Sequence, residues 1–220
     1  MTFLQLVNRV LRRLRATEAA GVTSGYPELV AALVNDAKRD VEDSGPWYAL
    51  RTTINKTLTP SAGSVSLTSE TNDRSYLLYV KGLPQTFVTT ADKEWRLDVI
   101  EKGEIDAIRA LYPDADENVP TAVAFTRSAD GLTAEFFPIP DLAYTVRFIM
   151  VVPQDDLEDK DDELTIPAAP VWTQALAFAA EERGEEMGTT VASLQRRADK
   201  ALMDAMNADF LQDELTFEAQ

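Results

Sequence analysis

Cysteine and histidine are both absent from this chain of 220 residues. Without them it has no disulfide, no thiolate nucleophile, no Cys/His zinc site and no histidine general base, so a Ser-His-Asp triad is excluded. Only nine glycines occur, and no glycine-rich loop of phosphate-binding form is among them. No apolar run approaches the roughly 20 residues that a membrane helix needs. An enzyme built on carboxylates or lysines remains open.

Basic residues are scarce, and their deficit grows along the chain. The 21 Lys and Arg stand against 37 Asp and Glu, which gives a formal net charge of −16. Residues 1–60 carry +2, residues 61–149 carry −6 and residues 150–220 carry −12. A protein that grips nucleic acid normally presents a basic face, whereas this chain as a whole would repel phosphate. Otherwise the composition, with 45% hydrophobic and 26% charged residues, is typical of a globular protein.

The first segment predicts an amphipathic helix that ends near Gly21. Thr2 and Gln5 stand in capping-box register. Apolar residues then recur at steps of three and four and share one face; they are Phe3, Leu6, Val7, Val10, Leu11 and Leu14. The opposite face and its edge carry four arginines, Arg9, Arg12, Arg13 and Arg15. These arginines are either a solvated helix face or a docking surface for an acidic partner, such as the acidic C-terminal third of a neighbouring copy.

Three further helices are predicted near the two ends of the chain. One opens at Pro27 and stops at the Ser-Gly-Pro sequence of residues 44–46. Another opens at Pro167, and a last helix follows a glycine-bracketed break and runs from about 190 to about 207. Each has an apolar stripe that needs a partner, so the simplest assembly packs both ends of the chain into one helical bundle.

The middle of the chain is predicted to form strands with one intervening helix. Turn signals separate the strand candidates at a spacing of about 8–12 residues, which favours an antiparallel arrangement over parallel βαβ units. Residues 97–111 predict the helix, although Gly103 weakens it. The strands are expected at residues 49–59, 64–68, 76–80, 86–90, 122–127, 132–138 and 144–152.

We therefore predict an α+β fold with a discontinuous helical bundle and an inserted antiparallel β-region. Residues 1–46 plus 165–208 form the bundle, and residues 47–164 form the β-rich insertion with its one helix. Residues 209–220 form a C-terminal tail. Apolar residues on this polar tail suggest docking onto a partner, although fraying is the default for a terminus; they are Phe210, Leu211, Leu215 and Phe217.

Two groups of acidic residues are candidates for a cation or catalytic site. Residues 154–163 contain seven acids, but the segment has no glycine and fails the EF-hand pattern, so a solvated loop is expected. At the end of a predicted helix, Glu181, Glu182, Glu185 and Glu186 stand one turn apart in pairs and could ligate a cation or hold a raised pKa, although an exposed helix end is the simpler interpretation. No residue is predicted as catalytic, cofactor-binding or metal-binding.

The chain resembles a known family of phage proteins. The opening TFLQLVNRVLRRLR, the following LVNDAKRDVEDSGPWYALRTT and the late segment EFFPIPDLAYTVRFIMVVPQDDLEDKDDELTIP are similar in texture and order to phage head-to-tail adaptors. These are portal-docking neck proteins related to tail tubular protein A of short-tailed phages. The resemblance spans most of the chain, and residues 60–120 match least.

The resemblance implies a structural virion protein, made in the host cytoplasm, that works without a cofactor and is not an enzyme. It implies a ring, usually of twelve copies, clamped beneath the portal with the tail component below and genomic DNA passing through unbound. The helical bundle would face the portal, and the β-rich part would meet its neighbours or the next tail component. Twelve copies would together carry a formal charge of −192, and such a conduit would not hold phosphate. The arginines of the first helix and the C-terminal tail are then the candidate contacts.

Other interpretations remain open at this stage. A different tail-completion or connector protein would share the class and differ in ring number and partner. A carboxylate-based, metal-dependent hydrolase would need acids that converge in a pocket. An acidic interaction module acting as a host regulator would be a monomer or dimer that never forms a ring.

Overall fold

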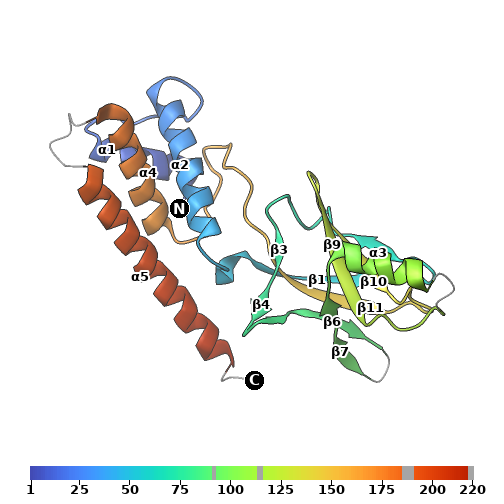
Figure 1. The fold of residues 1–220 in the computed structure, drawn as a ribbon. Coiled ribbons are helices and arrows are strands. Elements are labelled where there is room, and N and C mark those ends of the chain that lie inside the picture. The colour runs from blue at the N-terminus through green and yellow to red at the C-terminus, as the bar shows by residue number, and fades with distance from the viewer. Residues whose placement is uncertain (91–92, 113–115, 185–190, 218–220) are drawn as a thin grey trace. The chain divides into compact units, whose positions relative to one another are not determined.

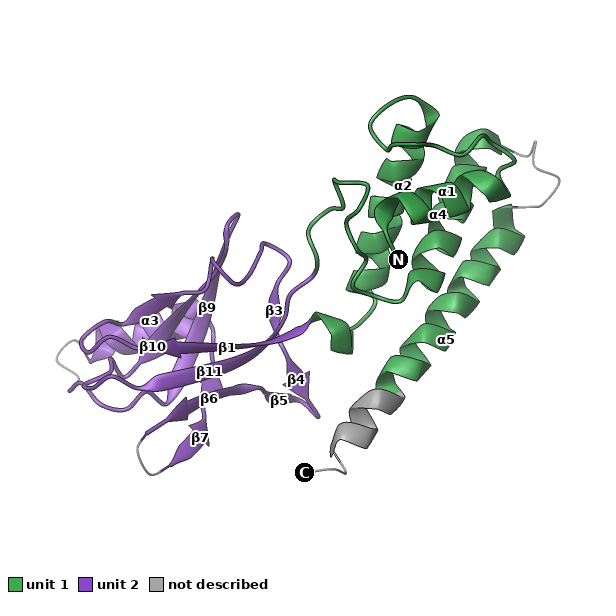
Figure 2. Cartoon of the chain, turned by 180° about the vertical axis from the view of Figure 1, so that it is seen from behind, with its two compact units in different colours: residues 1–50, 154–220 green, residues 51–153 purple. Residues whose placement is uncertain are grey.

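The chain has helices at both ends and a central β region, as Figure 1 shows. This computed structural model describes residues 1–90, 93–112, 116–184 and 191–217, and of residues 211–217 only the backbone. The α+β class with a discontinuous set of helices and antiparallel sheets is confirmed. The chain divides into two compact units (Figure 2). We call Met1–Leu50 with Gln154–Gln220 the helical unit, and Arg51–Pro153 the β unit.

The helical unit is built around one mostly buried helix, α4. It packs against each of the other three helices, and most of its side chains are buried, many of them alanines that allow close contact. A helix that is apolar on nearly all sides belongs inside a bundle. Within the described residues, no helix combines the length and apolar character that a membrane span requires. The helices are α1 (Phe3–Arg13), α2 (Tyr26–Asp43), α4 (Ala168–Arg183) and α5 (Val191–Phe217), with a short 3-10 turn at Tyr48–Leu50.

Helix α1 forms as its sequence predicts but ends earlier. Its capping box between Thr2 and Gln5 is present, and its six predicted apolar residues are buried. The helix stops at Arg13 rather than near Gly21, because Arg15 takes a left-handed backbone conformation with φ of 56°. The amides of Arg15 and Ala16 then reach back to the carbonyls of Arg12 and Leu11. This is the hydrogen-bond pattern of a Schellman cap, here with arginine at the position that glycine usually occupies.

Helix α5 is longer than expected. The prediction ended it near residue 207, whereas the helix continues through the expected tail to Phe217. Residues 208–217 contain neither glycine nor proline, so nothing local stops the helix there. In the second half of α5, the side chain of Asp209 accepts a hydrogen bond of 2.9 Å from the amide of Tyr48. This bond ties α5 to the 3-10 turn.

The β unit contains two main sheets that enclose its core. One has the order β1-β11-β6-β7 with β3 also paired to β11, and the other has the order β2-β10-β9-β8. Every pairing is antiparallel except that of β8 with β9. The strands are β1 Arg51–Thr57, β2 Ser64–Ser66, β3 Tyr76–Leu77, β4 Tyr79–Val80, β5 Leu83–Pro84, β6 Thr86–Thr89, β7 Glu94–Arg96, β8 Asp98–Val99, β9 Ala122–Ser128, β10 Gly131–Phe137 and β11 Thr145–Val151.

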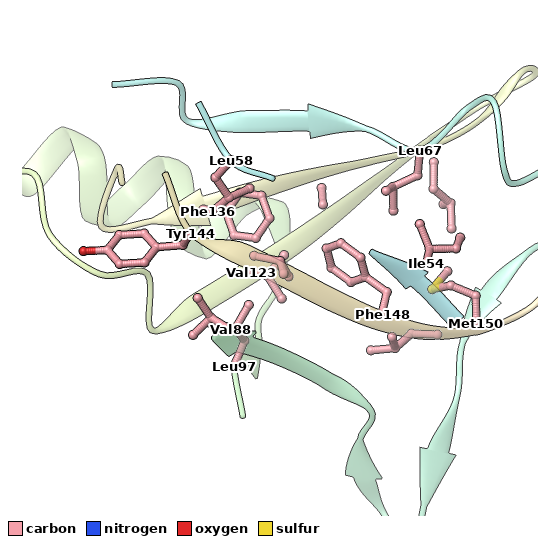
Figure 3. Close-up of a cluster of buried hydrophobic side chains, with 14 residues drawn as sticks. Ile54, Leu58, Leu67, Val88, Leu97, Val123, Phe136, Tyr144, Phe148 and Met150 are labelled. Carbon is pink, nitrogen blue, oxygen red and sulfur yellow. The ribbon is translucent and has the colours of Figure 1, made fainter. Parts of the chain in front are cut away.

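Side chains from both sheets meet in one apolar cluster (Figure 3). Phe148 of β11 lies at its centre, with its ring centroid 5.8 Å from Phe125 of β9 and 6.4 Å from Phe136 of β10. Such tilted and edge-on ring pairs add to the stability that area burial gives. The β unit therefore has a core of its own, separate from the packing of α4.

One predicted element of the β unit was placed wrongly at its start. The helix expected over residues 97–111 begins only at Lys102, as α3 (Lys102–Leu111). Asp98 and Val99 instead form β8, which pairs in parallel with the start of β9. Leu97 is fully buried in the core beside it. Leu97 and Val99 stand two residues apart, which is the spacing of a strand face. So short a run does not establish the pattern by itself, and the partner strand decides the structure here.

Candidate docking surface

Three predicted arginines surround an open hollow on α1. Arg9, Arg12 and Arg13 line it together with Met1 and Gln5, and its volume is about 730 Å³. All three arginines are exposed, because the opposite face of α1 packs against α2 and α4. The predicted split of this helix into an apolar inner face and a basic outer face is therefore confirmed.

Two of these arginines converge with a third, from α5, on one tryptophan. The guanidinium carbon of Arg9 lies 4.4 Å from the ring centroid of Trp172, that of Arg13 lies 5.9 Å away and that of Arg197 lies 5.4 Å away. These distances are within the range of cation–π attraction. The ring itself is 4% exposed and belongs to α4. We call Arg9, Arg13 and Arg197 around Trp172 the arginine cluster.

No carboxylate neutralises the arginine cluster within the described residues of the chain. Arg12, next to it, pairs with Glu18 at 3.1 Å, but Arg9, Arg13 and Arg197 take part in no such ion pair in that part of the chain. Three cations held close together repel one another, and an anion brought to them would be bound favourably. The cluster is thus suited to receive carboxylates from a partner.

The remaining predicted interface residues lie outside the arginine cluster. Arg15 is exposed beyond the end of α1 and does not join the arginine cluster. Phe210 is 63% exposed on α5, and Met203, two turns earlier on the same helix face, is 64% exposed. Large apolar side chains exposed along one face indicate a partner surface. The side chains of Leu211, Leu215 and Phe217 lie outside the described residues.

A second hollow, of opposite charge, lies between α2 and α4. Its volume is about 620 Å³. We call it the acidic hollow, and it is lined by Asp36, Asp40, Asp43, Glu181 and Glu182 together with Leu33, Arg39 and Phe178. Burial raises the pKa of Asp40, and the nearby charges of Asp36 and Asp43 raise it further. Arg39, the one cation at this rim, is already paired with Asp156, at 3.0 Å between Nε and Oδ1.

Neither acidic group has the arrangement of a metal site in the ranges that the structure covers. No set of three acids there could hold a metal ion. Glu181 and Glu182 are exposed, while Glu185 and Glu186 lie outside the described residues. In the loop of residues 154–163, Asp162 accepts hydrogen bonds of 2.8 Å from the amides of Glu158 and Asp159 and so closes a turn.

Sequence reasoning missed Arg197 and the acidic hollow. Both depend on how helices far apart in the sequence come together, since α5 brings Arg197 to α1 and α4 brings its glutamates to α2. The one local signal was the basic pair of residues 196–197 on an otherwise acidic C-terminal third.

A family model described as SU10 adaptor protein matches residues 1–216. Among curated proteins, none matches the chain. The family match covers the helical unit and the β unit alike, so it concerns the whole architecture.

Proposed function

Because the chain belongs to the SU10 adaptor protein family, we propose that its copies form a ring that joins the portal of a phage head to the tail. The family is one of structural phage adaptors, not of enzymes, and its members belong to the virion and interact with portal and tail proteins. In the proposal, the ring has twelve copies and genomic DNA passes through it without specific binding. The observation that carries the proposal is the family match over residues 1–216.

The charge of the chain supports a role as a conduit. A ring of twelve copies would carry a formal charge of −192, which would repel the phosphates of passing DNA. Lysines and arginines aimed at the DNA would create binding sites along the path and slow its passage. A ring with little basic surface toward its channel avoids this effect.

Each part of the chain has a proposed task. The helical bundle of residues 1–46 and 165–208 would face the portal, and the β-rich region of residues 47–164 would meet the neighbouring copy or the next tail component. Residues 209–220 would dock onto the portal. Exposure of Phe210 and Met203 supports this last contact, because a free helix gains little from presenting such side chains to water.

The proposal is tested by mixing the purified chain with portal rings. We expect a complex whose mass and symmetry in electron micrographs correspond to one ring of adaptor per portal. A connector of another kind would give a different copy number or bind only the tail component. An acidic regulator would remain a monomer or dimer in the presence of portal, and that result would contradict the proposal.

Deleting residues 210–220 tests the C-terminal contact. The deletion keeps Asp209 and its hydrogen bond to Tyr48, so the helical unit should keep its circular dichroism spectrum. We expect portal attachment to be lost. The matched control replaces Asp204, an exposed acid of α5, by Ala and should attach normally. Normal attachment by the shortened chain would remove this contact from the proposal.

A further inference from the structure

We propose that the arginine cluster of one copy docks onto the acidic hollow of the next copy. This inference rests on the proposed ring and names the surfaces that would hold neighbouring copies together. Both surfaces belong to the helical unit, and both are charged, hollowed and exposed. The partner is thus a second copy of this chain, recognised through its carboxylates.

The two surfaces carry opposite charges. The arginine cluster brings three guanidinium groups, none of them ion-paired within the described ranges, and Arg12 stands at its edge. The acidic hollow brings five carboxylates, while its own cation, Arg39, is engaged by Asp156. Burial raises the pKa of Asp40, and repulsion from Asp36 and Asp43 raises it further. Guanidinium groups from a neighbour would relieve this repulsion and can form bidentate pairs with carboxylates.

The two surfaces lie on opposite sides of α4. Trp172 and Glu181 are nine residues apart, and at about 100° per residue their side chains leave the helix about half a turn apart. Helices α1 and α5 supply the arginines around Trp172, whereas α2 supplies the aspartates beside Glu181. A contact between two different surfaces on opposite sides repeats from copy to copy and generates a ring or a filament. A symmetric pair would have to bring both surfaces of each copy into one interface, which surfaces on opposite sides of a helix do not allow.

A charge-swap experiment tests this contact. Variant R13E/R197E makes the arginine cluster acidic. Variant D36R/D40R/E181R makes the acidic hollow basic, because only Asp43 and Glu182 then remain as acids against three new arginines. Each variant alone should lose at least tenfold in copy-to-copy association, because its two surfaces now carry the same sign. An equimolar mixture should regain association, because both types of contact in an alternating ring again join opposite charges. Variant R15E/R196E is the matched control: it changes the net charge as much as R13E/R197E does and leaves the arginine cluster intact.

Association is measured by chemical cross-linking, which this cysteine-free chain makes specific. Arg12→Cys and Glu182→Cys are introduced together in every variant, and a short bismaleimide joins neighbouring copies at the rims of the two surfaces. Cross-linking is followed in concentrated protein alone and in protein bound to portal, and circular dichroism verifies that each variant is folded. We expect a ladder of linked copies from the parent chain, the control and the mixture, in at least one of the two settings.

The outcomes separate this inference from the proposed function. Three results would overturn the docking of the arginine cluster onto the acidic hollow. They are unchanged ladders from the two charge-reversed variants, no rescue in the mixture, and no ladder from the parent chain in either setting. Loss of portal binding by R13E/R197E with a normal ladder would assign the arginine cluster to the portal and would also overturn it. Failure of the parent to bind portal would contradict the proposed function, while the ladder in concentrated protein would still decide the inference.

Discussion

At the scale of single residues, the helical unit contains one fully buried ion pair. Lys38 and Glu42 of α2 have no exposed side-chain surface, and the ammonium lies 3.2 Å and 3.3 Å from the two carboxylate oxygens. The ammonium also donates to the carbonyl of Gln154, whose amide donates to Glu42. The pair thus joins α2 to the first residue of the returning chain, and its partners satisfy both charges.

Removing one member of this pair should be costly. Lys38→Met leaves a buried carboxylate without its cation, and we expect the free energy of unfolding to fall by about 3–5 kcal/mol. The double variant K38M/E42L buries no charge and should lose much less. Urea denaturation followed by circular dichroism measures both. As a surface control, Glu18→Gln at the exposed Arg12 pair should cost about 1 kcal/mol or less. A cost of K38M no larger than that of the control would contradict the assigned role.

A second residue-scale prediction concerns the turn between β9 and β10. Gly131 has φ of +128°, and a Cβ there would lie 2.6 Å from Oγ1 and 2.8 Å from the carbonyl oxygen of Thr71. Thr71 cannot yield easily, because its hydroxyl donates to Leu67 and accepts from the amide of Leu132. Gly131→Ala should therefore destabilise the β unit by about 2–4 kcal/mol, through strain and overlap together.

Gly82→Ala is the matched control for this turn. Gly82 also has a positive φ, of +76°, but nothing lies within 4 Å of its added Cβ. We expect a loss of only about 1–2 kcal/mol from the backbone conformation. Thermal unfolding of both variants makes the comparison, and equal losses would show that the overlap with Thr71 is relieved by movement.

At the scale of elements, one carboxylate of the sheet binds two cations of α3. Glu135 of β10 accepts hydrogen bonds from Lys102 at 2.7 Å and from Arg109 at 3.1 Å, both on α3. The hydrogen bond from Lys102 is the main reason why the pKa of Glu135 lies below its ordinary value, although partial burial opposes the shift. The hydrogen bond that Lys102 donates to Glu135 in turn raises the pKa of Lys102, with Asp106 contributing. The ionised pair is thus the form that the fold favours.

The interaction of Glu135 with Lys102 and Arg109 predicts that the folded protein loses stability in acid. Because the folded state lowers the pKa of Glu135, its contribution is complete above the pKa of the unfolded carboxyl, about 4.3, and is lost as the pH falls through the lower folded value. Glu135→Gln should cost about 1–2 kcal/mol at pH 7 and progressively less below pH 4. Urea denaturation at pH 7, 5 and 3 measures the difference. A difference that does not change with pH would show that packing, and not charge, holds α3.

The elements that the sequence predicts well are those whose signals are local. The capping box and apolar face of α1, Pro27 in the first turn of α2 and the turns between β9, β10 and β11 all lie within a few residues of what they specify. The sequence could not distinguish strand β8 from a helix, because Val123, the pairing partner of Val99, lies 24 residues further along the chain. The end of α1 depends on a left-handed Arg15, a position for which arginine gives no sequence signal.

The candidate site was predictable only in part, for the same reason. The outward face of α1 followed from the spacing of its arginines, which is a property of one helix. The stacking of Arg9 and Arg197 on Trp172 requires three helices to be packed, and the acidic hollow requires two. The helical state of residues 210–217 was missed because a terminus is expected to fray, although no residue there marks a stop.

At the scale of the whole molecule, the chain enters and leaves the β unit at neighbouring points, on two strands that pair with each other. The chain enters it at Arg51 and leaves it after Pro153, and Arg51 is the partner of Val151 in the β1–β11 ladder. Adjacent ends and a separate core are the features of a unit that can fold alone. We expect residues 51–153, produced by themselves, to unfold cooperatively on heating.

Circular dichroism and proton NMR spectra of residues 51–153 measure this folding. Phe136→Ala in the same fragment removes a fully buried ring from its core and should abolish or greatly lower the transition. The complementary chain, in which a short glycine-serine linker joins Leu50 to Gln154, should retain its helical spectrum. A fragment without a cooperative transition would show that the β unit depends on the remainder of the chain.

The position of Trp172 has a practical consequence. Its indole is shielded from water and surrounded by guanidinium groups, so its fluorescence depends on the local electric field. In a chain whose other two tryptophans, Trp47 and Trp95, are replaced by phenylalanine, a carboxylate that arrived at those guanidinium groups would shift the emission wavelength. The molecule thereby carries an intrinsic optical reporter of what touches this face, readable in real time and without a label.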